Sequence, residues 1–372
     1  MKVLITGAQG FVARNLLAHL RERQDIQILT FSREDNLDSL ERMVAEVDFV
    51  FHLAGVNRPK DPEDFRTGNV DLTKMICDKI AIAGRKIPIV YTSSSQAGLD
   101  NLYGASKLGA EQALIDLATQ HTVPVHIFRL PNVFGKWARP NYNSAVATFC
   151  SNISRGLPIN VNDPGASITL VYIDDVISQF IAVMEGHVAG DPFVSISPTY
   201  NTTVGKLAEQ LGRFHESRET LITEAVGTGL TRALYSTYLS YVPPERFAYP
   251  VPKYGDPRGV FVEMLKTKDS GQFSYFTARP GVTRGGHYHH SKTEKFLVIK
   301  GAACFRFRCI DSDEFYELFT SGEKPEVVET VPGWTHDITN VGSDEMIVML
   351  WANEIFDREN PDTYAMPISI DA

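Results

Sequence analysis

The first half of the chain alternates short runs of β-branched and other apolar residues with segments in which apolar residues recur every three or four positions. In segment 11–23, for example, Val12, Leu16 and Leu20 fall on one face of a helix. Strands that alternate with helices are typical of a parallel sheet covered on both faces, so we expect a doubly wound α/β fold. The predicted strands are residues 2–6, 26–31, 48–53, 87–92 and 123–129.

The pattern changes in the second half. After residue 145 it becomes less regular, with helices predicted at 205–214 and 217–225, and prolines and aromatic residues cluster in 241–259 as in a linker. Beyond the linker, short strands separated by turn residues predict a small all-β barrel or jelly roll. These strands are 260–266, 272–277, 295–298, 304–310, 326–331 and 346–351. We expect one domain to span residues 1–245 and a second to span 246–372.

Composition narrows the class of protein. A chain of 372 residues predicts two or three domains, and 43% hydrophobic with 22% charged residues is ordinary for a globular protein. The net charge of -9 argues against nucleic acid or an anionic membrane as the main partner. No apolar run is long enough to span a bilayer, and no signal peptide is evident, so we expect no membrane insertion. The cysteines show no paired spacing, so we expect reduced thiols in a cytoplasmic protein. They are Cys77, Cys150, Cys304 and Cys309.

A glycine-rich turn follows the first predicted strand. In "TGAQGFVA", Gly7, Gly10 and Ala13 would let the turn tighten and bring backbone amides close to a pyrophosphate, which indicates a dinucleotide site in a Rossmann fold. After the second strand, "TFSRED" places Arg33 where an NAD-preferring fold usually has an acidic residue. A guanidinium there can bind a 2′-phosphate, so we expect NADPH as the cofactor.

The segment "VYTSSSQAGLDNLYGASKLGAEQ" carries residues for acid–base chemistry. Tyr103 and Lys107 lie one helical turn apart and share a face, although such a pair on its own is most often a surface feature. We expect the ammonium group to lower the pKa of the phenol and make it a usable acid or base. Ser94, or its neighbour Ser95, is placed to donate a hydrogen bond to a substrate carbonyl.

With "HLAGVNRP" (52–59), Asn69 and "RLPNVFG" (129–135), these motifs make residues 1–240 resemble the extended short-chain dehydrogenase/reductases, a family acting largely on nucleotide sugars. The resemblance implies a catalytic set of Ser94, Tyr103 and Lys107. It implies that the cofactor is lined by Gly7, Gly10, Phe11, Leu53, Ala54 and Lys107, and that Arg58 and Asn132 contact the substrate.

One departure narrows the reaction. Dehydratases of this family place an Asp–Glu pair directly after the catalytic Ser or Thr, whereas Ser95 and Gln96 stand here. Dehydration is therefore disfavoured, and ketone reduction fits best.

The second half contains a cluster of metal-ligand residue types. His287 and His289 alternate on one face of a strand, Glu294 follows after a turn, and His336 comes later, after a Pro-Gly turn. Three imidazoles and a carboxylate are suited to a divalent first-row metal. For "HYHH" alone, a solvated histidine patch would be the simpler interpretation.

The spacing of these residues, from Gly281 through His287, His289 and Glu294 to Gly301, matches the first cupin motif. Pro332-Gly333, His336 and Asn340 resemble the second motif, so residues 260–353 are similar to a cupin. His290 is extra to the pattern and is expected either to support the ligands or to be exposed.

"YGDPRGVFVE" (254–263) and "TRGGHYHH" (283–290) are similar to cupin epimerases that act on keto-sugar nucleotides. In those enzymes the histidine matching His287 is the base. Their catalytic tyrosine is missing here, where Ile355 and Phe356 stand in its neighbourhood. A metal could replace the missing acid. A metal-bound His287 could not also be a free base, so both roles stay open.

The order of the two domains, with "FGKWARPNYNS" (134–144) and "YSTYLSY" (235–241), resembles a family of bifunctional capsular-polysaccharide enzymes along essentially the whole chain. The resemblance implies that the cupin epimerises C3 of a UDP-4-keto-6-deoxy-N-acetylhexosamine. The reductase domain would then reduce C4 with NADPH, giving UDP-2-acetamido-2,6-dideoxy-β-L-talose, a precursor of N-acetyl-L-fucosamine in capsule or O-antigen. It also implies zinc and a homodimer.

Three alternatives remain at this point. A metal-cupin oxygenase fused to a reductase would use the same ligands but would need a redox metal. A non-catalytic cupin that only binds the sugar nucleotide or drives dimerisation would leave a one-step reductase. A reductase domain acting as an oxidising epimerase would retain NAD tightly, which Arg33 disfavours.

Overall fold

The computed structural model describes residues 1–188, 191–312 and 314–368, and the chain forms two compact units. The first unit comprises residues 1–211 and 232–243, and the second comprises 212–231 and 244–372. Residues 212–231 thus lie on the other side of the predicted boundary at 245. They join the second unit because β9 (Ile222–Thr223) pairs in parallel with β11 (Gly259–Thr267).

A five-stranded parallel sheet organises the first unit, in the order β2-β1-β3-β4-β5. β3 is wholly buried and β1 nearly so, as expected of strands covered on both faces. These strands confirm the prediction of a Rossmann-type fold, and their bounds lie within two residues of those predicted. The strands are β1 (Lys2–Thr6), β2 (Gln27–Phe31), β3 (Phe49–His52), β4 (Ile89–Ser94) and β5 (Val125–Leu130).

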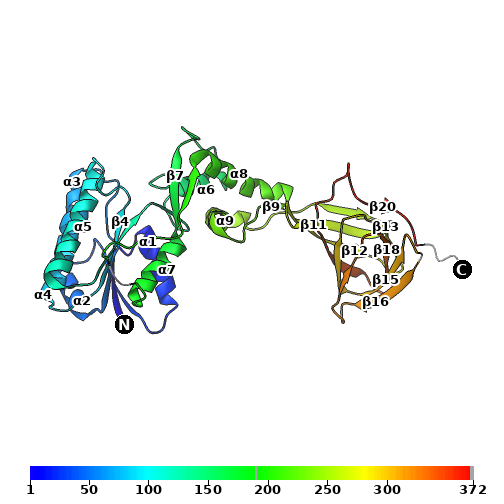
Figure 1. The fold of residues 1–372 in the computed structure, drawn as a ribbon, viewed down its shortest axis with the longest axis horizontal. Helices are drawn as coiled ribbons and strands as arrows, with labels where there is room; N and C mark the ends of the chain where they lie inside the picture. The colour runs from blue at the N-terminus through cyan, green and yellow to red at the C-terminus, as the bar shows by residue number, and fades with distance from the viewer. Residues whose placement is uncertain (189–190, 313, 369–372) are drawn as a thin grey trace. The chain divides into compact units, whose positions relative to one another are not determined.

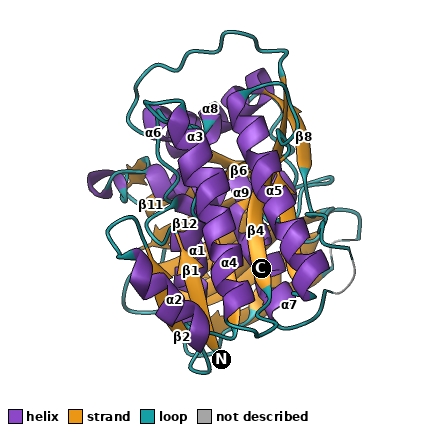
Figure 2. Cartoon of the chain, turned by 90° about the vertical axis from the view of Figure 1, so that its left-hand side faces the viewer, coloured by secondary structure: helices purple, strands orange, loops and turns teal. Residues whose placement is uncertain are grey.

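Helices cover both faces of this sheet, as Figures 1 and 2 show. α2 (Leu37–Glu46), α4 (Leu72–Ile82) and α5 (Leu102–His121) pack against one another on one face, and their apolar side chains form a core with the sheet. α1 (Phe11–Arg21) and α7 (Ile173–Met184) pack together on the other face. The short α3 (Glu63–Phe65) and a π-helical turn, Arg66–Asp71, precede α4.

A smaller three-stranded sheet completes the first unit, in the order β6-β7-β8. Here the sequence prediction was partly wrong. The predicted helix 217–225 is instead the end of a single longer helix, α8, followed by β9, and helix α9 was not predicted. The elements are β6 (Asn132–Phe134), β7 (Ser167–Tyr172), β8 (Tyr200–Thr203), α6 (Ala145–Ile153), α8 (Val204–Thr220), α9 (Gly229–Tyr241) and a 3₁₀ turn, Pro244–Arg246.

From β10 onward the described part of the second unit is all-β, as predicted, and contains two sheets, whereas its residues 212–220 and 229–231 belong to helices α8 and α9. The first sheet runs β10-β11-β12-β19-β14-β17, with β9 beside β11, and the second runs β16-β15-β18-β13-β20. A core of buried aromatic and aliphatic side chains, including Phe276, Phe296 and Phe305, fills the unit. The remaining strands are β10 (Lys253–Asp256), β12 (Gly271–Ala278), β13 (Thr283–Tyr288), β14 (Glu294–Lys300), β15 (Ala302–Cys309), β16 (Phe315–Ser321), β17 (Val327–Glu329), β18 (Trp334–Asn340), β19 (Met346–Ala352) and β20 (Tyr364–Ala365).

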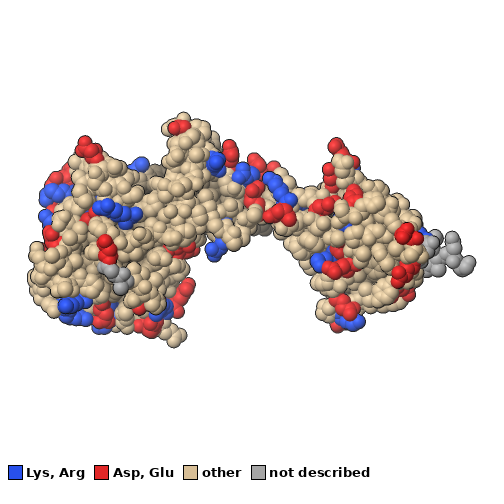
Figure 3. Space-filling model, in the orientation of Figure 1, with Lys and Arg blue, Asp and Glu red and all other residues tan. Residues whose placement is uncertain are grey.

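Basic and acidic side chains are interspersed over the face of each unit that Figure 3 shows. Among the described residues, no helix is long and apolar enough to cross a membrane.

Candidate functional sites

The first site lies at the point where the order of the strands in the parallel sheet reverses. β1 has β2 on one side and β3 on the other, so the loops that follow β1 and β3 diverge and leave a crevice at the carboxyl ends of the strands. Gly7 closes the first loop with φ +69°, and its amide donates to the Phe31 carbonyl. A Cβ on Gly7 would lie 2.6 Å from Cα of Ala54, so only glycine fits this close approach.

A cavity of about 920 Å³ opens in this crevice. α1 points its N-terminus at the cavity, and its N-cap residue Gly10 makes no side-chain capping bond, which leaves the first amides of the helix free for an anion. The structure therefore brings most of the predicted first-unit residues together. Those that line the cavity are Gly10, Phe11, Leu53, Ser94, Tyr103, Lys107 and Asn132.

Tyr103 and Ser94 face the cavity as a pair. Ser94 ends β4 and is buried, and its hydroxyl is hydrogen-bonded with that of Tyr103, near the start of α5. Burial raises the pKa of Tyr103, and the contact with Ser94 only partly opposes this. The prediction that an ammonium group lowers the pKa of this phenol is thus wrong for the cofactor-free protein.

The reason is the position of Lys107. Its ammonium donates to the Tyr91 hydroxyl at 3.3 Å and to the Thr92 carbonyl at 3.0 Å. Burial lowers the pKa of Lys107 to about 8, and the more distant Glu111 opposes this. Lys107 is therefore a desolvated cation that tolerates the loss of its proton more easily than an exposed lysine.

Beneath this pair, the "HLAG" segment has a structural role. His52 is fully buried, with Nδ1 2.8 Å from the Thr6 hydroxyl and Nε2 2.8 Å from the Thr73 hydroxyl. Burial lowers the pKa of His52 to about 3, so the ring is neutral at pH 7. It ties β1 and β3 to α4 directly below the cofactor crevice.

Several cavity residues were not assigned from the sequence. Arg139 and Arg155 bring positive charge to the cavity wall, and Trp137, which also lines it, is exposed with φ +71°. The Tyr142 hydroxyl donates to the Asn57 side chain at 2.7 Å and so joins two loops of the cavity. "FGKWARPNYNS" contains three of these residues, but no motif spacing connects them to the glycine turn.

Four predicted residues are not part of the cavity lining. Gly7 and Ala54 lie against each other where the loops after β1 and β3 meet. Arg33 and Arg58 are both exposed. The acidic residue near Arg33 is engaged in its own turn, because the Asp35 carboxylate accepts from the Ser32 amide at 2.7 Å and from the Ser32 hydroxyl at 2.9 Å.

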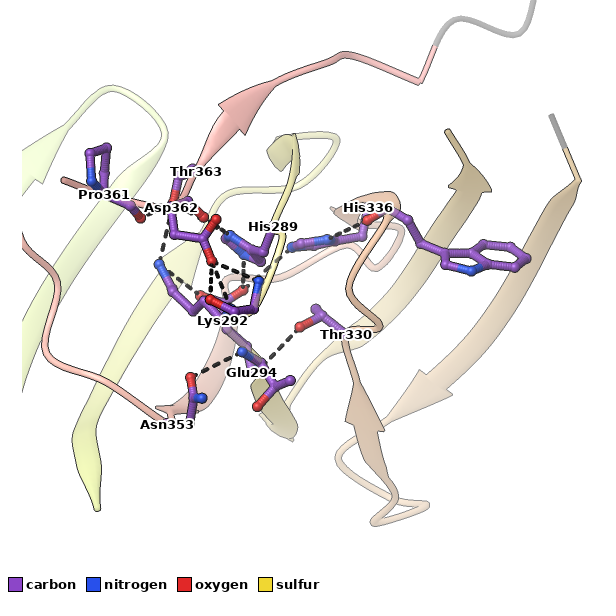
Figure 4. A network of polar contacts seen from close by, with 12 residues as sticks. His289, Lys292, Glu294, Thr330, His336, Asn353, Pro361, Asp362 and Thr363 are labelled. Atoms are coloured by element: carbon purple, nitrogen blue, oxygen red, sulfur yellow. Dashed lines mark hydrogen bonds and ion pairs between the residues drawn. The ribbon is translucent and has the colours of Figure 1, made fainter. Parts of the chain in front are cut away.

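The second site is the histidine cluster of the second unit. His287 at the end of β13, His289 just beyond it, Glu294 at the start of β14 and His336 on β18 bring one ligand atom each within 4.8 Å of one another. Glu294 Oε2 lies 3.2 Å from His289 Nε2 and 3.4 Å from His336 Nε2. Figure 4 shows Glu294 and the two histidines directed toward a common point.

The spacing around Glu294 suits a tetrahedral metal. Atoms about 2.1 Å from a Zn²⁺ ion lie roughly 3.4 Å apart, close to the separations of Glu294 Oε2 from His289 Nε2 and His336 Nε2. His336 Nε2 is buried and, although Glu294 Oε2 lies 3.4 Å away, it forms no well-directed hydrogen bond to the described residues. A buried polar atom without such a bond is costly, and a ligated ion would satisfy it.

Burial and mutual contact set the charges of the cluster. Burial alone would raise the pKa of Glu294, but its contacts with His289 and His336 outweigh this and hold the pKa well below its usual range. Burial, followed by the neighbouring His336, lowers the pKa of His287 to about 4. A carboxylate and a neutral imidazole at pH 7 are the forms that bind metal.

Lys292 lies beside the cluster and is itself covered by Phe356, whereas Tyr364 stacks elsewhere. The Phe356 ring lies 5.3 Å from the ammonium of Lys292, a buried residue whose Nζ is 3.9 Å from Glu294 Oε1. Tyr364 is 46% exposed and stacks on Tyr288, away from the cluster. His290 is exposed, in agreement with one of its two predicted roles. Lys292 was missed because its sequence position gives no sign of burial.

Comparison with known proteins connects both sites to one family. Residues 3–197 match the NAD dependent epimerase/dehydratase family, which is more than half of the chain. The chain belongs to this family. Residues 254–364 match the polysaccharide biosynthesis C-terminal domain. A curated relative from Pseudomonas aeruginosa, named UDP-2-acetamido-2,6-beta-L-arabino-hexul-4-ose reductase, is 62% identical over 368 residues and 99% of both chains.

Solved structures allow the fold of nearly the whole chain to be compared. The capsular polysaccharide assembling protein CapF from Staphylococcus aureus is 41% identical, with a TM-score of 0.92 over 99% of this chain and 100% of that one. A UDP-glucose 4-epimerase from Thermotoga maritima, 19% identical, has a TM-score of 0.56 over 65% of this chain and 98% of its own, and shows the fold alone. The resemblance to capsular-polysaccharide enzymes inferred from the sequence is confirmed.

The buried ammonium of Lys107 predicts a pH dependence of stability. Its pKa is about 8 when folded and 10.5 ordinarily, so between these values the unfolded chain holds a proton that the folded protein has released. Stability therefore rises with pH in this window, by up to about 1.4 kcal/mol per pH unit. Urea denaturation from pH 7.5 to 9.5 should show wild type gaining stability relative to Lys107→Met. The exposed Lys74→Met variant should follow wild type, and parallel curves for Lys107→Met would contradict the assignment.

Proposed function

We propose that this protein is a bifunctional nucleotide-sugar enzyme, a UDP-sugar 4-keto reductase whose second unit epimerises the substrate at C3. The observation that carries the proposal is the presence of two separate sets of reactive groups in one chain. Ser94, Tyr103 and Lys107 line the dinucleotide crevice, whereas three histidines and Glu294 converge in the all-β unit. The name of the 62% identical relative denotes reduction of a 4-keto sugar nucleotide, which supports the reductase step.

In the proposed reduction, NADPH delivers a hydride to C4 and Tyr103 gives its hydroxyl proton to the C4 oxygen. Because burial raises the pKa of Tyr103, the phenol is protonated and ready to donate at pH 7. The Ser94 hydroxyl, already hydrogen-bonded with Tyr103, orients the ketone. Lys107 contributes positive charge beneath the site and holds the cofactor ribose.

We assign the cofactor as NADPH. The Asp35 carboxylate accepts both hydrogen bonds that Ser32 offers, so it is already used within the turn. Arg33 is exposed beside it and free to meet a 2′-phosphate. Arg139 and Arg155, which line the cavity together with the proposed substrate residue Asn132, would balance the diphosphate of the sugar nucleotide. Arg58, outside the lining, would have to reach the substrate from an exposed loop.

In the proposed epimerisation, His289, Glu294 and His336 hold a divalent metal, for which zinc is our choice. These three are buried and meet at tetrahedral spacing, whereas His287 is more accessible. When bound, the metal would polarise the C4 ketone and acidify the C3 proton. The neutral imidazole of His287 would accept that proton, and water on the opposite face of C3 would return one, which inverts C3 and leaves hydroxide to be neutralised by the His287 imidazolium.

The proposed substrate is a UDP-4-keto-6-deoxy-N-acetylhexosamine and the product UDP-2-acetamido-2,6-dideoxy-β-L-talose, for capsule or O-antigen synthesis. The ketone that permits epimerisation is consumed by the reduction, so C3 inversion must come first. The matched polysaccharide biosynthesis domain over residues 254–364 supports this place in polymer assembly.

We also propose a homodimer in the cytoplasm. The first sheet of the second unit exposes a row of apolar side chains from neighbouring strands, including Phe273, Met349 and Val327. Contiguous apolar patches of this kind favour a protein interface, and sedimentation equilibrium tests it. All four cysteines are free thiols, as expected in a reducing compartment.

Replacing Tyr103 by Phe should remove the proton donor of the reduction. NADPH oxidation with the 4-keto sugar should fall by at least about 100-fold in kcat/KM, while exchange of the C3 proton in D2O without NADPH stays at the wild-type rate. The exposed Tyr249→Phe variant serves as a control and should behave as wild type. Loss of both reactions in Tyr103→Phe would argue against separate sites.

Replacing His287 by Gln should separate the base from the ligands. In D2O without NADPH, the C3 proton signal of the 4-keto sugar should persist in His287→Gln, with exchange at least about 100-fold slower than in wild type and zinc still bound. Loss of zinc together with exchange would make His287 a ligand. His290→Gln is the matched control. A C3 signal that also persists in zinc-loaded wild type would leave a one-step reductase whose cupin only binds or dimerises.

Replacing Arg33 by Ala should change cofactor preference. A hydrogen-bonded 2′-phosphate contributes roughly 1.5–3 kcal/mol, so kcat/KM for NADPH should fall about 10- to 100-fold while that for NADH is unchanged. Steady-state assays with both cofactors measure this, with the exposed Arg42→Ala on α2 as control. Equal losses with NADPH and NADH would refute a 2′-phosphate contact.

A further inference from the structure

The segment 361–366, here called the C-terminal strap, lies beside β13, the strand that contains His287 and leads directly to His289. Within it, β20 pairs antiparallel with β13, placing Ala365 opposite His287 and Tyr364 opposite Tyr288. The Met366 amide donates to the Gly286 carbonyl at 2.9 Å, which extends the pairing. The strap is more than 70 residues away from β13 in the sequence, yet it is fixed against it by main-chain bonds.

One hydrogen bond from the strap fixes the tautomer and the orientation of the His289 ring. His289 Nδ1 lies 2.6 Å from the backbone carbonyl oxygen of Asp362. A carbonyl oxygen can only accept, so Nδ1 carries the proton and, in the neutral ring, Nε2 carries the lone pair. Nε2 faces Glu294 Oε2, another acceptor, at 3.2 Å. Two acceptors at this distance require a second ring proton or a bound metal ion between them.

The Asp362 side chain holds the turn that links the two ligands. Its Oδ1 accepts from the His290 amide at 3.0 Å. Its Oδ2 accepts from the Ser291 amide at 2.8 Å, the Ser291 hydroxyl at 2.9 Å and the Lys292 amide at 2.8 Å. Figure 4 shows Asp362 next to His289 and above Lys292 and Glu294. These three residues, 290–292, are nearly all of the connection between His289 and Glu294.

Asp362 suits this position in charge and in backbone shape. Burial would raise the pKa of its carboxyl, but the amides of residues 290–292 outweigh this and hold the pKa well below its usual range. Its φ of +36° lies in the left-handed region, which Asp and Asn adopt more readily than most residues. A single residue therefore supplies two acceptors to the turn and a third to the ligand ring.

We propose that Asp362 is a positioning residue of the metal centre. Its carbonyl sets the tautomer and orientation of His289, and its carboxylate sets the distance between His289 and Glu294. The inference rests on the proposed metal centre in the second unit. Its consequence is that metal affinity depends on a side chain that does not itself touch the metal. Loss of such supporting bonds typically weakens metal binding 10- to 100-fold.

The test uses the full-length protein with its metal removed. Zinc affinity is measured by competition with a chromophoric chelator, and Co²⁺ is added separately so that its visible absorption reports tetrahedral geometry. Asp362→Asn keeps the shape and the left-handed backbone but turns one acceptor oxygen into a donor. Asp362→Gly keeps the carbonyl and the backbone but removes both side-chain acceptors. The control is Asp357→Asn, an exposed carboxylate of the preceding segment that accepts the Glu359 amide at 2.9 Å.

We expect zinc affinity to fall about 10- to 100-fold in Asp362→Asn and at least as far in Asp362→Gly, with a weakened Co²⁺ spectrum and no change in Asp357→Asn. Circular dichroism melts of the metal-free proteins fix a temperature at which all variants are folded. Wild-type affinity and spectrum in both folded Asp362 variants would show that the strap is only a structural staple and overturn the inference. Failure of wild type to bind either metal would instead refute the metal centre, and the inference with it.

Discussion

Lys107 in the first unit and Glu294 in the second are charged groups that the fold removes from water, and each site is organised around the partners that compensate for this. An unpaired buried charge costs several kcal/mol, so its position is tightly constrained. Lys107 has a phenol and a carbonyl as partners. Glu294 has two imidazoles, whose free ring positions are in turn fixed by backbone carbonyls.

The two sites differ in the protonation states that burial favours, and therefore in the chemistry that they can perform. In the first unit, burial keeps Tyr103 protonated, which suits an acid that gives one proton to an alkoxide. In the second unit, the carboxylate stays ionised and His287 stays neutral, which suits metal binding and proton removal. The 4-ketone of the proposed substrate links the two, because it activates C3 for one site and is the group reduced by the other.

Local sequence was a good guide wherever a function depends on neighbouring residues. The glycine turn, the Tyr103–Lys107 pair and the His287–His289–Glu294 spacing each lie within one strand–turn–helix or strand–turn–strand unit, and the structure places them together. Local sequence was a poor guide where long-range contacts decide the secondary structure. Residues 217–225 have a helical pattern, but pairing with β11 draws Ile222 and Thr223 into a strand.

The sequence by itself determined the fold class of both halves, the cofactor crevice and the four candidate ligands, because periodicity and motif spacing encode local geometry. Only the tertiary structure decided their electrostatics and their support. Burial reversed the expected direction of the Tyr103 pKa, and Lys107 proved to be held by Tyr91. Asp362 lies more than 70 residues from the turn it caps, and no local pattern records a hydrogen bond that forms only when distant strands pair.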